Sequence, residues 1–157
     1  MAKEETTIRR AAMDYLARRE HSRYELQQKL NTRFIDSAII PSILDALEDK
    51  GLQSDKRFAE NYIRWRSNKG FGQLHIEQDL YQKGVAEADI QYGFKENAID
   101  WQQLIQQQYH KKYGDTLPED SKSKARCQRF LLSRGFSFTQ INQLWRSLPA
   151  ANTAYDA

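Results

Sequence analysis

Two helices and a tight turn can be recognised in the stretch KRFAENYIRWRSNKGFGQLHIEQDL, residues 56–80. Three aromatic side chains recur at i, i+4 and i+7 in its first half: Phe58, Tyr62 and Trp65. This spacing puts them on one face of a helix over residues 57–68, and the pattern predicts that the face is buried. Gly70 stands where a left-handed residue ends a helix without a Cβ clash, and Gly72 opens the next helix. The glycines and rings are therefore expected to be structural, with Trp65 in the core.

Cations occupy the opposite face of the same predicted helix. Arg57 and Arg64 lie on that face, and Lys69 follows its end. Side chains so placed point outward and are candidates for contact with a partner. A merely solvated face is the commoner explanation of such a pattern, and the sequence leaves both interpretations open.

Helical periodicity continues through the rest of the chain. Apolar residues share a face in three further sets, namely Met13, Leu16 and Ala17; Ile40, Ile43, Leu44 and Leu47; and Trp101, Leu104, Ile105 and Tyr109. Between these sets stand residues that start or stop helices, among them Ser22, Gly51, Ser54, Gly84 and Gly135. Strand-like alternation is absent, so the sequence predicts an all-α protein of about nine helices.

The chain also repeats itself with a period of about 50 residues. The residues that coincide in register are Leu30, Leu80 and Leu131; Ile40, Ile90 and Ile141; and Lys83-Gly84-Val85 with Arg134-Gly135-Phe136. The pattern predicts three three-helix repeats, at 1–51, 52–97 and 98–148, followed by a flexible tail at 149–157. Repeats that stack only on their neighbours form an elongated, curved array, which suits a large partner. The alternative is an irregular helical bundle in which these coincidences arise by chance.

Composition and charge narrow the class of protein. The formal net charge is +3 and the pI is about 8.9, which suggests an anionic partner without requiring one. No apolar run is long enough to span a membrane, and the N-terminus MAKEETTIRR carries acids and is not typical of a secretory signal. A single cysteine, Cys127, excludes an internal disulfide and fits a reducing compartment. A soluble, cytoplasmic, monomeric protein is expected.

The positive charge is concentrated in the third repeat. Residues 121–148 hold six cations and no acid: Lys122, Lys124, Arg126, Arg129, Arg134 and Arg146. Lys122, Arg126 and Arg129 stand at i, i+4 and i+7, on one helical stripe away from Cys127. The stripe is either a docking surface for an anionic partner or a solvated face. The candidate partner-binding residues are therefore Arg57, Arg64, Lys69, Lys122, Lys124, Arg126 and Arg129.

No pattern of catalysis or of cofactor binding is present. The phosphate-binding motif G-x-x-x-x-G-K-[ST] is missing, and the three histidines form no ligand pair at helical spacing. His75-Ile76-Glu77 matches the H-x-E of zinc deaminases, but the P-C-x-x-C that must accompany it is missing. Cys127 lies on an apolar stripe and is expected to be buried. We predict that the chain is not an enzyme and binds no cofactor or metal.

Three segments resemble the RecX family of recombination regulators. The stretch LEDKGLQSDKRFAENYIRWRSNKGFGQLHIEQDLYQKGV, residues 47–85, is similar to the family's central signature, and KSKARCQRFLLSRGFSFTQINQLW is similar to its C-terminal one. LARREHSRYELQQKL resembles the N-terminal signature, so the similarity covers about residues 8–148. The chain departs from the family at Gln53-Ser54-Asp55, where two acids are more usual, and Ser54 is expected to cap the helix instead.

The resemblance implies a function as well as a fold. Members of the family are small proteins of tandem three-helix repeats that bind the RecA recombinase. They lodge in the groove of the RecA filament on single-stranded DNA, block its extension and depress ATP hydrolysis and strand exchange. Direct contact with single-stranded DNA stays open. Two alternatives are a basic helical DNA-binding protein that acts without a recombinase, and a scaffold for some other protein.

Overall fold

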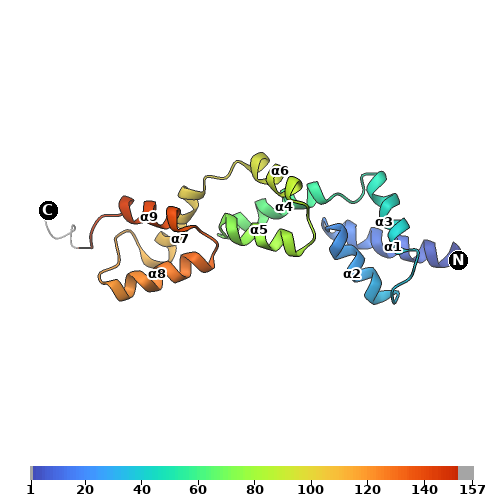
Figure 1. Ribbon diagram of the computed structural model, residues 1–157, viewed down its shortest axis with the longest axis horizontal. Coiled ribbons are helices and arrows are strands. Elements are labelled where there is room, and N and C mark those ends of the chain that lie inside the picture. The colour runs from blue at the N-terminus through green and yellow to red at the C-terminus, as the bar shows by residue number, and fades with distance from the viewer. Residues whose placement is uncertain (1, 152–157) are drawn as a thin grey trace. The chain divides into compact units, whose positions relative to one another are not determined.

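All regular secondary structure in residues 2–151, the part that the computed structural model describes, is helical (Figure 1). The helices are α1 (Ala2–Arg18), α2 (Arg23–Arg33), α3 (Ile40–Asp49), α4 (Asp55–Asn68), α5 (Gln73–Gln82), α6 (Glu87–Asn97), α7 (Trp101–Tyr113), α8 (Ser121–Ser133) and α9 (Phe138–Ser147). They form three successive three-helix repeats, α1–α3, α4–α6 and α7–α9, and this confirms the predicted fold. Of the predicted flexible tail, residues 152–157 lie outside the described part. Its first residue, Pro149, accepts a hydrogen bond from the Leu117 N–H at 2.8 Å.

The helices group into two compact units. Compact unit 1 comprises Met1–Ile63 and Asp79–Asn97, and compact unit 2 comprises Arg64–Gln78 and Ala98–Ala157. The first repeat thus belongs wholly to compact unit 1 and the third to compact unit 2. The second repeat is divided, because α4 and α5 contribute residues to both.

Each terminal repeat encloses its own apolar core. The buried cluster of the first repeat is Ile8, Ala11, Ala12, Leu26, Leu30, Ile40, Ile43, Leu44 and Leu47. That of the third is Ile105, Tyr109, Cys127, Leu131, Phe136, Ile141, Leu144 and Trp145. The predicted inner face of α3 is confirmed, but that predicted for α1 is wrong, because Met13 is 38% exposed. Small alanines face the core instead, and they let α1 approach α2 and α3.

Helix starts follow ordinary capping chemistry. The Ser22 hydroxyl accepts from the Glu25 N–H at 3.1 Å while the Glu25 carboxylate accepts from the Ser22 N–H, which closes a capping box at the start of α2. Ser137 and Gln140 form the same box at the start of α9, with an amide in place of the carboxylate. The Ser54 hydroxyl accepts from the Arg57 N–H at 3.1 Å, as the sequence predicts.

The turn between α2 and α3 contains no glycine, whereas the corresponding turns of the later repeats each contain one with a positive φ. Gly84 and Gly135 take φ values of +76° and +100° in the corresponding turns. In the first repeat Ile35 and Asp36 take φ values of +39° and +51°. The backbone of a β-branched residue is strained in this region. Ile35 is also 85% exposed, so its side chain adds nothing to the core of the first repeat.

Compact unit 2 contains a backbone contact between two turns, which we call the second joint. The Gly72 N–H donates to the Arg134 carbonyl at 2.7 Å, and the Leu74 N–H donates to the Gly135 carbonyl at 3.1 Å. A Cβ on Gly72 would lie 2.6 Å from the carbonyl carbon of Gly135. Gly72 is therefore required because the two backbones touch, and this packing role adds to its predicted place at the start of a helix.

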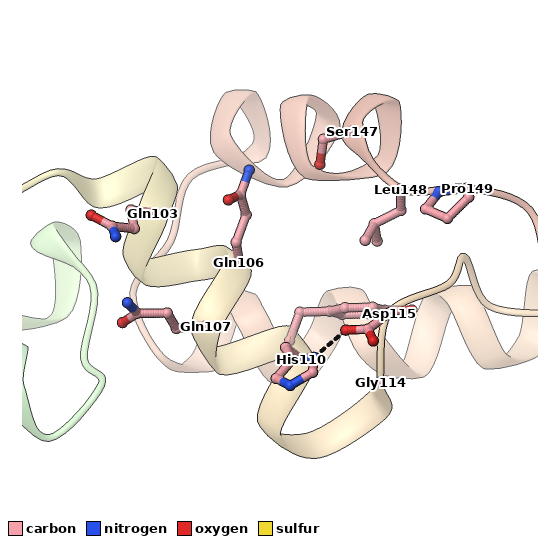
Figure 2. A pocket seen from close by; sticks show the side chains of 10 residues that line it. Gln103, Gln106, Gln107, His110, Gly114, Asp115, Ser147, Leu148 and Pro149 are labelled. Atoms are coloured by element: carbon pink, nitrogen blue, oxygen red, sulfur yellow. Dashed lines mark hydrogen bonds and ion pairs between the residues drawn. The ribbon is translucent and has the colours of Figure 1, made fainter.

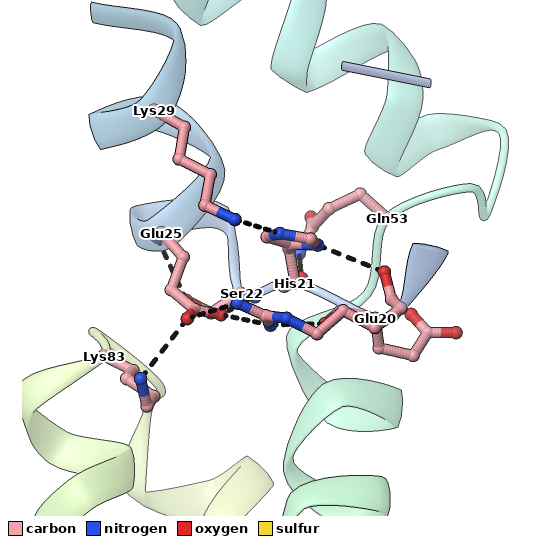
Figure 3. Close-up of polar contacts among 8 residues, drawn as sticks. Glu20, His21, Ser22, Glu25, Lys29, Gln53 and Lys83 are labelled. Atoms are coloured by element: carbon pink, nitrogen blue, oxygen red, sulfur yellow. Dashed lines mark hydrogen bonds and ion pairs between the residues drawn. The ribbon is translucent and has the colours of Figure 1, made fainter. Parts of the chain in front are cut away.

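Compact unit 1 contains a polar counterpart, which we call the first joint (Figure 3). Lys83, from the turn before α6, pairs with Glu25 of α2 at 3.3 Å, and Arg19 holds the same carboxylate at 3.1 Å. Burial acts to raise the pKa of Glu25, but Arg19, the Ser22 N–H and Lys83 outweigh it and lower the pKa from 4.5 to about 2. The Glu25 side chain is only 14% exposed, so its charge is held by these partners more than by solvent.

We predict that Gly72→Ala destabilises the protein by about 1–3 kcal/mol, because its Cβ must displace the Gly135 backbone. Urea unfolding followed by circular dichroism measures the loss. Gln73→Ala is the control, since this neighbouring position already carries a Cβ. A Gly72→Ala protein as stable as the control would contradict the close backbone contact.

The low pKa of Glu25 predicts an acid-sensitive stability. Its carboxylate stabilises the folded state fully above the unfolded pKa of 4.5, and this contribution of roughly 3 kcal/mol is lost as the pH falls through about 2. Glu25→Gln removes the titration and keeps a capping box of the Ser137–Gln140 kind. The difference in unfolding free energy between wild type and Glu25→Gln should shrink by about 1.4 kcal/mol between about pH 7 and about pH 3.5. A difference that is the same at both pH values would show that Glu25 is not held ionised.

Candidate functional site

Helix α8 carries four exposed cations, which we call the α8 cationic surface: three share one stripe, and Lys124 lies on another side of the helix, with its Nζ 5.7 Å from the centre of the Trp145 ring. The four side chains are Lys122, Lys124, Arg126 and Arg129. The Asp120 carboxylate caps the helix by accepting from the Ser123 N–H at 2.7 Å. Cys127 and Leu131 lie on the inner face and anchor α8 in the core of the third repeat. Burial of Cys127 and exposure of the cationic stripe both agree with the sequence prediction.

The cations of the α8 cationic surface are not neutralised within the described residues. None of the four lies within 4.0 Å of an Asp or Glu carboxylate there. In compact unit 1, by contrast, Arg19, Arg23 and Arg57 each pair with a carboxylate. These three arginines are engaged by nearby acids, whereas α8 carries four exposed cations and no Asp or Glu of its own.

Rings and cations alternate in a row beside the end of α8. The Arg66 guanidinium lies 3.8 Å from the centre of the Phe71 ring, and Arg134 lies 4.8 Å from the same ring. Arg134 also lies 5.3 Å from Phe130, and Lys112 covers that ring at 3.7 Å. Such contacts hold cations over ring faces without cancelling their charge. Sequence reasoning missed this row, because it combines three segments that only the folded chain brings together.

The predicted cations near the end of α4 are exposed, but the adjacent ring is not where the sequence placed it. Arg64 and Lys69 are both exposed. Trp65 is 53% exposed, so the prediction that it belongs to the core is wrong. The buried face of α4 is centred on Ile63, because Gly93 of α6 comes so close that a Cβ on it would lie 2.7 Å from the Ile63 Cδ1. This approach turns α4 away from the face that aromatic spacing alone favours.

Arg57 has a structural use inside compact unit 1. Its Nε lies 2.5 Å from the Glu20 carboxylate, and its Nη2 donates to the carbonyls of Gly51 and Leu52 at 3.1 and 3.3 Å. These contacts tie the second repeat to the first and engage most of the guanidinium. The other six candidate residues belong to compact unit 2.

A hollow of about 450 Å³ in compact unit 2 offers no arrangement for catalysis (Figure 2). Its lining includes a His110–Asp115 pair and Ser147, which are the residue types of a hydrolase triad. However, the Ser147 hydroxyl donates to the Leu144 carbonyl at 2.7 Å, and Figure 2 shows Ser147 and His110 on opposite sides of the hollow. The serine is therefore not activated by the histidine.

A second hollow of about 490 Å³ lies beside the first joint in compact unit 1. Its lining carries two acids and two lysines among tyrosines and glutamines: Tyr24, Glu25, Gln28, Lys29, Tyr62, Asp79, Gln82 and Lys83. The acids are already engaged, Glu25 with Lys83 and Asp79 with the Tyr62 hydroxyl at 2.8 Å. The charges balance, so this hollow does not favour either sign of ligand.

Two further features bear on cofactors and membranes. Among residues 2–151 no group of three His, Cys, Asp or Glu side chains is placed to hold a metal ion. Burial raises the pKa of the Cys127 thiol, so the thiol is harder to ionise to the reactive thiolate. Over the same residues, every helix is too short or too polar to cross a bilayer.

Known proteins share this arrangement of three three-helix repeats. The chain matches three RecX family models: the first three-helix domain at residues 9–51, the second at 54–92 and the third at 99–145. Curated relatives are named "Regulatory protein RecX". That of Pseudomonas putida strain GB-1 is 42% identical over 137 residues, which is 87% of this chain and 88% of the relative. That of Ectopseudomonas mendocina is 40% identical over 139 residues, or 88% and 93% of the two chains.

Solved structures agree with these matches. A crystal structure of a regulatory protein RecX superposes with a TM-score of 0.76 at 24% identity, and covers 91% of this chain and 73% of that chain. RecX from Lactobacillus salivarius superposes with a TM-score of 0.68 at 23% identity, over 93% and 97% of the two chains. These likenesses show the fold. Together with the family models and the curated relatives, they establish that the chain belongs to the RecX family of regulatory proteins.

Proposed function

We propose that this protein is a negative regulator of the RecA recombinase, and that the α8 cationic surface is part of its docking site. It binds in the groove of the RecA filament on single-stranded DNA, blocks extension of the filament and inhibits ATP hydrolysis and strand exchange. Membership of the RecX family supports the choice of partner. The observation that carries the choice of surface is that α8 gathers four exposed cations and no acid, and that none of the four has a carboxylate partner among the described residues.

The electrostatics of α8 support a docking role. Like charges at i, i+4 cost about 0.2–0.5 kcal/mol per pair in an isolated helix, and Lys122, Arg126 and Arg129 repel one another in this way. An anionic surface that meets the stripe relieves that repulsion. Exposed cations also steer encounter with such a surface, so their loss slows association and weakens its dependence on salt.

The protein acts, in this proposal, by binding alone. It needs no cofactor and carries out no reaction of its own, and its place is the cytoplasm, in the control of DNA repair, recombination and the SOS response. As a monomer, a chain of three tandem repeats would contact several neighbouring subunits of a filament. Each bound molecule would then disturb several ATP sites, so inhibition would need far less than one molecule per RecA subunit.

A second candidate function is binding to DNA without a recombinase, and the same four cations favour it. If about four of them met phosphates, the logarithm of the DNA affinity would fall with the logarithm of salt concentration with a slope near −3.6. The modest net charge of +3 argues against this candidate, because the acids of the rest of the chain repel DNA.

We expect the triple variant Lys122→Ala, Arg126→Ala, Arg129→Ala to need at least about tenfold more protein to inhibit ATP hydrolysis by RecA on single-stranded DNA. The side chains are exposed, so circular dichroism should stay unchanged. The matched control is Arg10→Ala, Arg18→Ala, Lys95→Ala, which removes the same charge from exposed positions of compact unit 1.

The outcomes separate the candidates. Equal inhibition by both triple variants would overturn the docking role of the α8 cationic surface. No inhibition by the wild type at equimolar protein would overturn the RecA assignment. In that case, tight and salt-sensitive binding of the wild type to single-stranded DNA alone would favour the second candidate.

A further inference from the structure

The first and second joints occupy equivalent places in the repeat pattern. Lys83-Gly84 of the first joint lies in register with Arg134-Gly135 of the second. Each glycine is packed tightly against the helix that follows the opposing turn: a Cβ on Gly84 would lie 2.7 Å from the Tyr24 Cβ, and one on Gly135 would lie 2.5 Å from the His75 Cβ. The two joints thus pair equivalent turns and helices, although Gly135 contacts the residue one position further along its helix than Gly84 does.

The two joints are held by different forces. The second joint has two backbone hydrogen bonds, from Gly72 and Leu74, at the place where the first joint has an ion pair between Lys83 and Glu25. No carboxylate stands in the second joint at the position of Glu25, because His75 occupies it in register.

Besides the packing of Gly84 against Tyr24, further polar contacts join the first and second repeats. Besides the Lys83–Glu25 pair they include Arg57 with Glu20, and the Arg23 N–H with the Asp55 carboxylate at 2.8 Å. The apolar cluster of the first repeat contains no residue beyond Leu47, so it does not extend across this joint.

Figure 3 shows Lys83 reaching the Glu25 carboxylate from the second repeat. Arg19, which directly follows α1, lies beside the same carboxylate. His21, from the same turn, is buried, and its Nε2 lies 2.8 Å from Lys29 Nζ. Burial lowers the pKa of His21, so it stays neutral and adds no charge to the joint. Glu25 is therefore the acid that holds Lys83 in this joint.

Salt acts on these two kinds of contact unequally. Ion pairs that are partly exposed weaken as ionic strength rises, and Lys83 is 31% exposed. Backbone hydrogen bonds between tightly packed turns carry no net charge and are screened far less. The same solution conditions therefore loosen one joint and leave its counterpart closed.

We propose that the first joint is an electrostatic latch: loss of the Lys83–Glu25 ion pair loosens the hold of the second repeat on the first, while the second joint stays closed. The latch gives compact unit 1 two states, and a change in ionic surroundings selects between them. An anionic partner that competes for Lys83 would open it in the same way. The proposal concerns the free protein and does not depend on the identity of the partner.

Amide hydrogen exchange measured by NMR on the full chain tests the latch. The reporter of the first joint is the Arg23 N–H, a first-turn amide whose acceptor is the Asp55 carboxylate across the joint. The reporters of the second joint are the Gly72 and Leu74 N–H groups. The Ile43 N–H, in the core of the first repeat, reports unfolding of that repeat as a whole.

Lys83→Met should lower the protection of the Arg23 amide about tenfold and leave Ile43, Gly72 and Leu74 unchanged. Raising NaCl from about 0.05 M to about 0.5 M should do the same to the wild type, and should have little further effect on Lys83→Met. Arg134→Met, the matched control at the equivalent position, should leave Arg23 unaffected.

Three results would overturn the latch. One is Arg23 protection that neither Lys83→Met nor salt changes. Another is an equal loss at Gly72 and Leu74 in salt, because both joints would then respond alike. The third is a parallel loss at Ile43, which would show unfolding of the first repeat in place of loosening at the joint. Since no RecA is present, failure here leaves the proposed function standing, and failure of RecA inhibition leaves the latch standing.

Discussion

The contact between Gly72 and Gly135 is the constraint on which the third repeat depends. Two backbones touch there, and a single Cβ on Gly72 would lie 2.6 Å from the opposing carbonyl. The contact fixes the turn before α9 against the turn before α5, and so it fixes α8, which enters that turn. The α8 cationic surface and the row of rings and cations beside it are both built outward from this point. The docking role proposed for this surface relies on such rigidity, because side chains held in place before binding lose less entropy when a partner arrives.

Much of this arrangement can be predicted from the sequence, because it rests on periodicity. The spacing of Ile40, Ile43, Leu44 and Leu47 is enough to define the inner face of α3, and the recurrence of such faces is enough to define three repeats. Exposure of the α8 cations is predictable for the same reason. A helix that buries Cys127 and Leu131 must turn Lys122, Arg126 and Arg129 outward.

What the sequence could not supply depends on contacts between distant segments. Aromatic spacing predicts that Trp65 belongs to the core. The closeness of Gly93 to Ile63 instead turns the Ile63 face of α4 inward and leaves Trp65 exposed. The sequence presents Arg57 as an available cation because its partner, Glu20, stands far back in the chain, in the turn between α1 and α2. The sequence around Phe71 likewise does not indicate that the Arg66 and Arg134 guanidinium groups both lie over its ring. The contacts between repeats are made at the two joints, and the periodicity of a single helix does not predict which residues meet there.

The self-contained core of the first repeat has a consequence for how the chain is made. Every residue of that cluster lies between Ile8 and Leu47, so its contacts join positions close in sequence. Chains with such local contacts fold fast, and synthesis on the ribosome proceeds from the N-terminus at about 5–20 residues per second. The first repeat therefore has all its core residues once it has left the ribosome, before the third repeat has been translated. Its ionic partner Lys83 arrives later, which makes the first joint a contact between a repeat already folded and one still emerging.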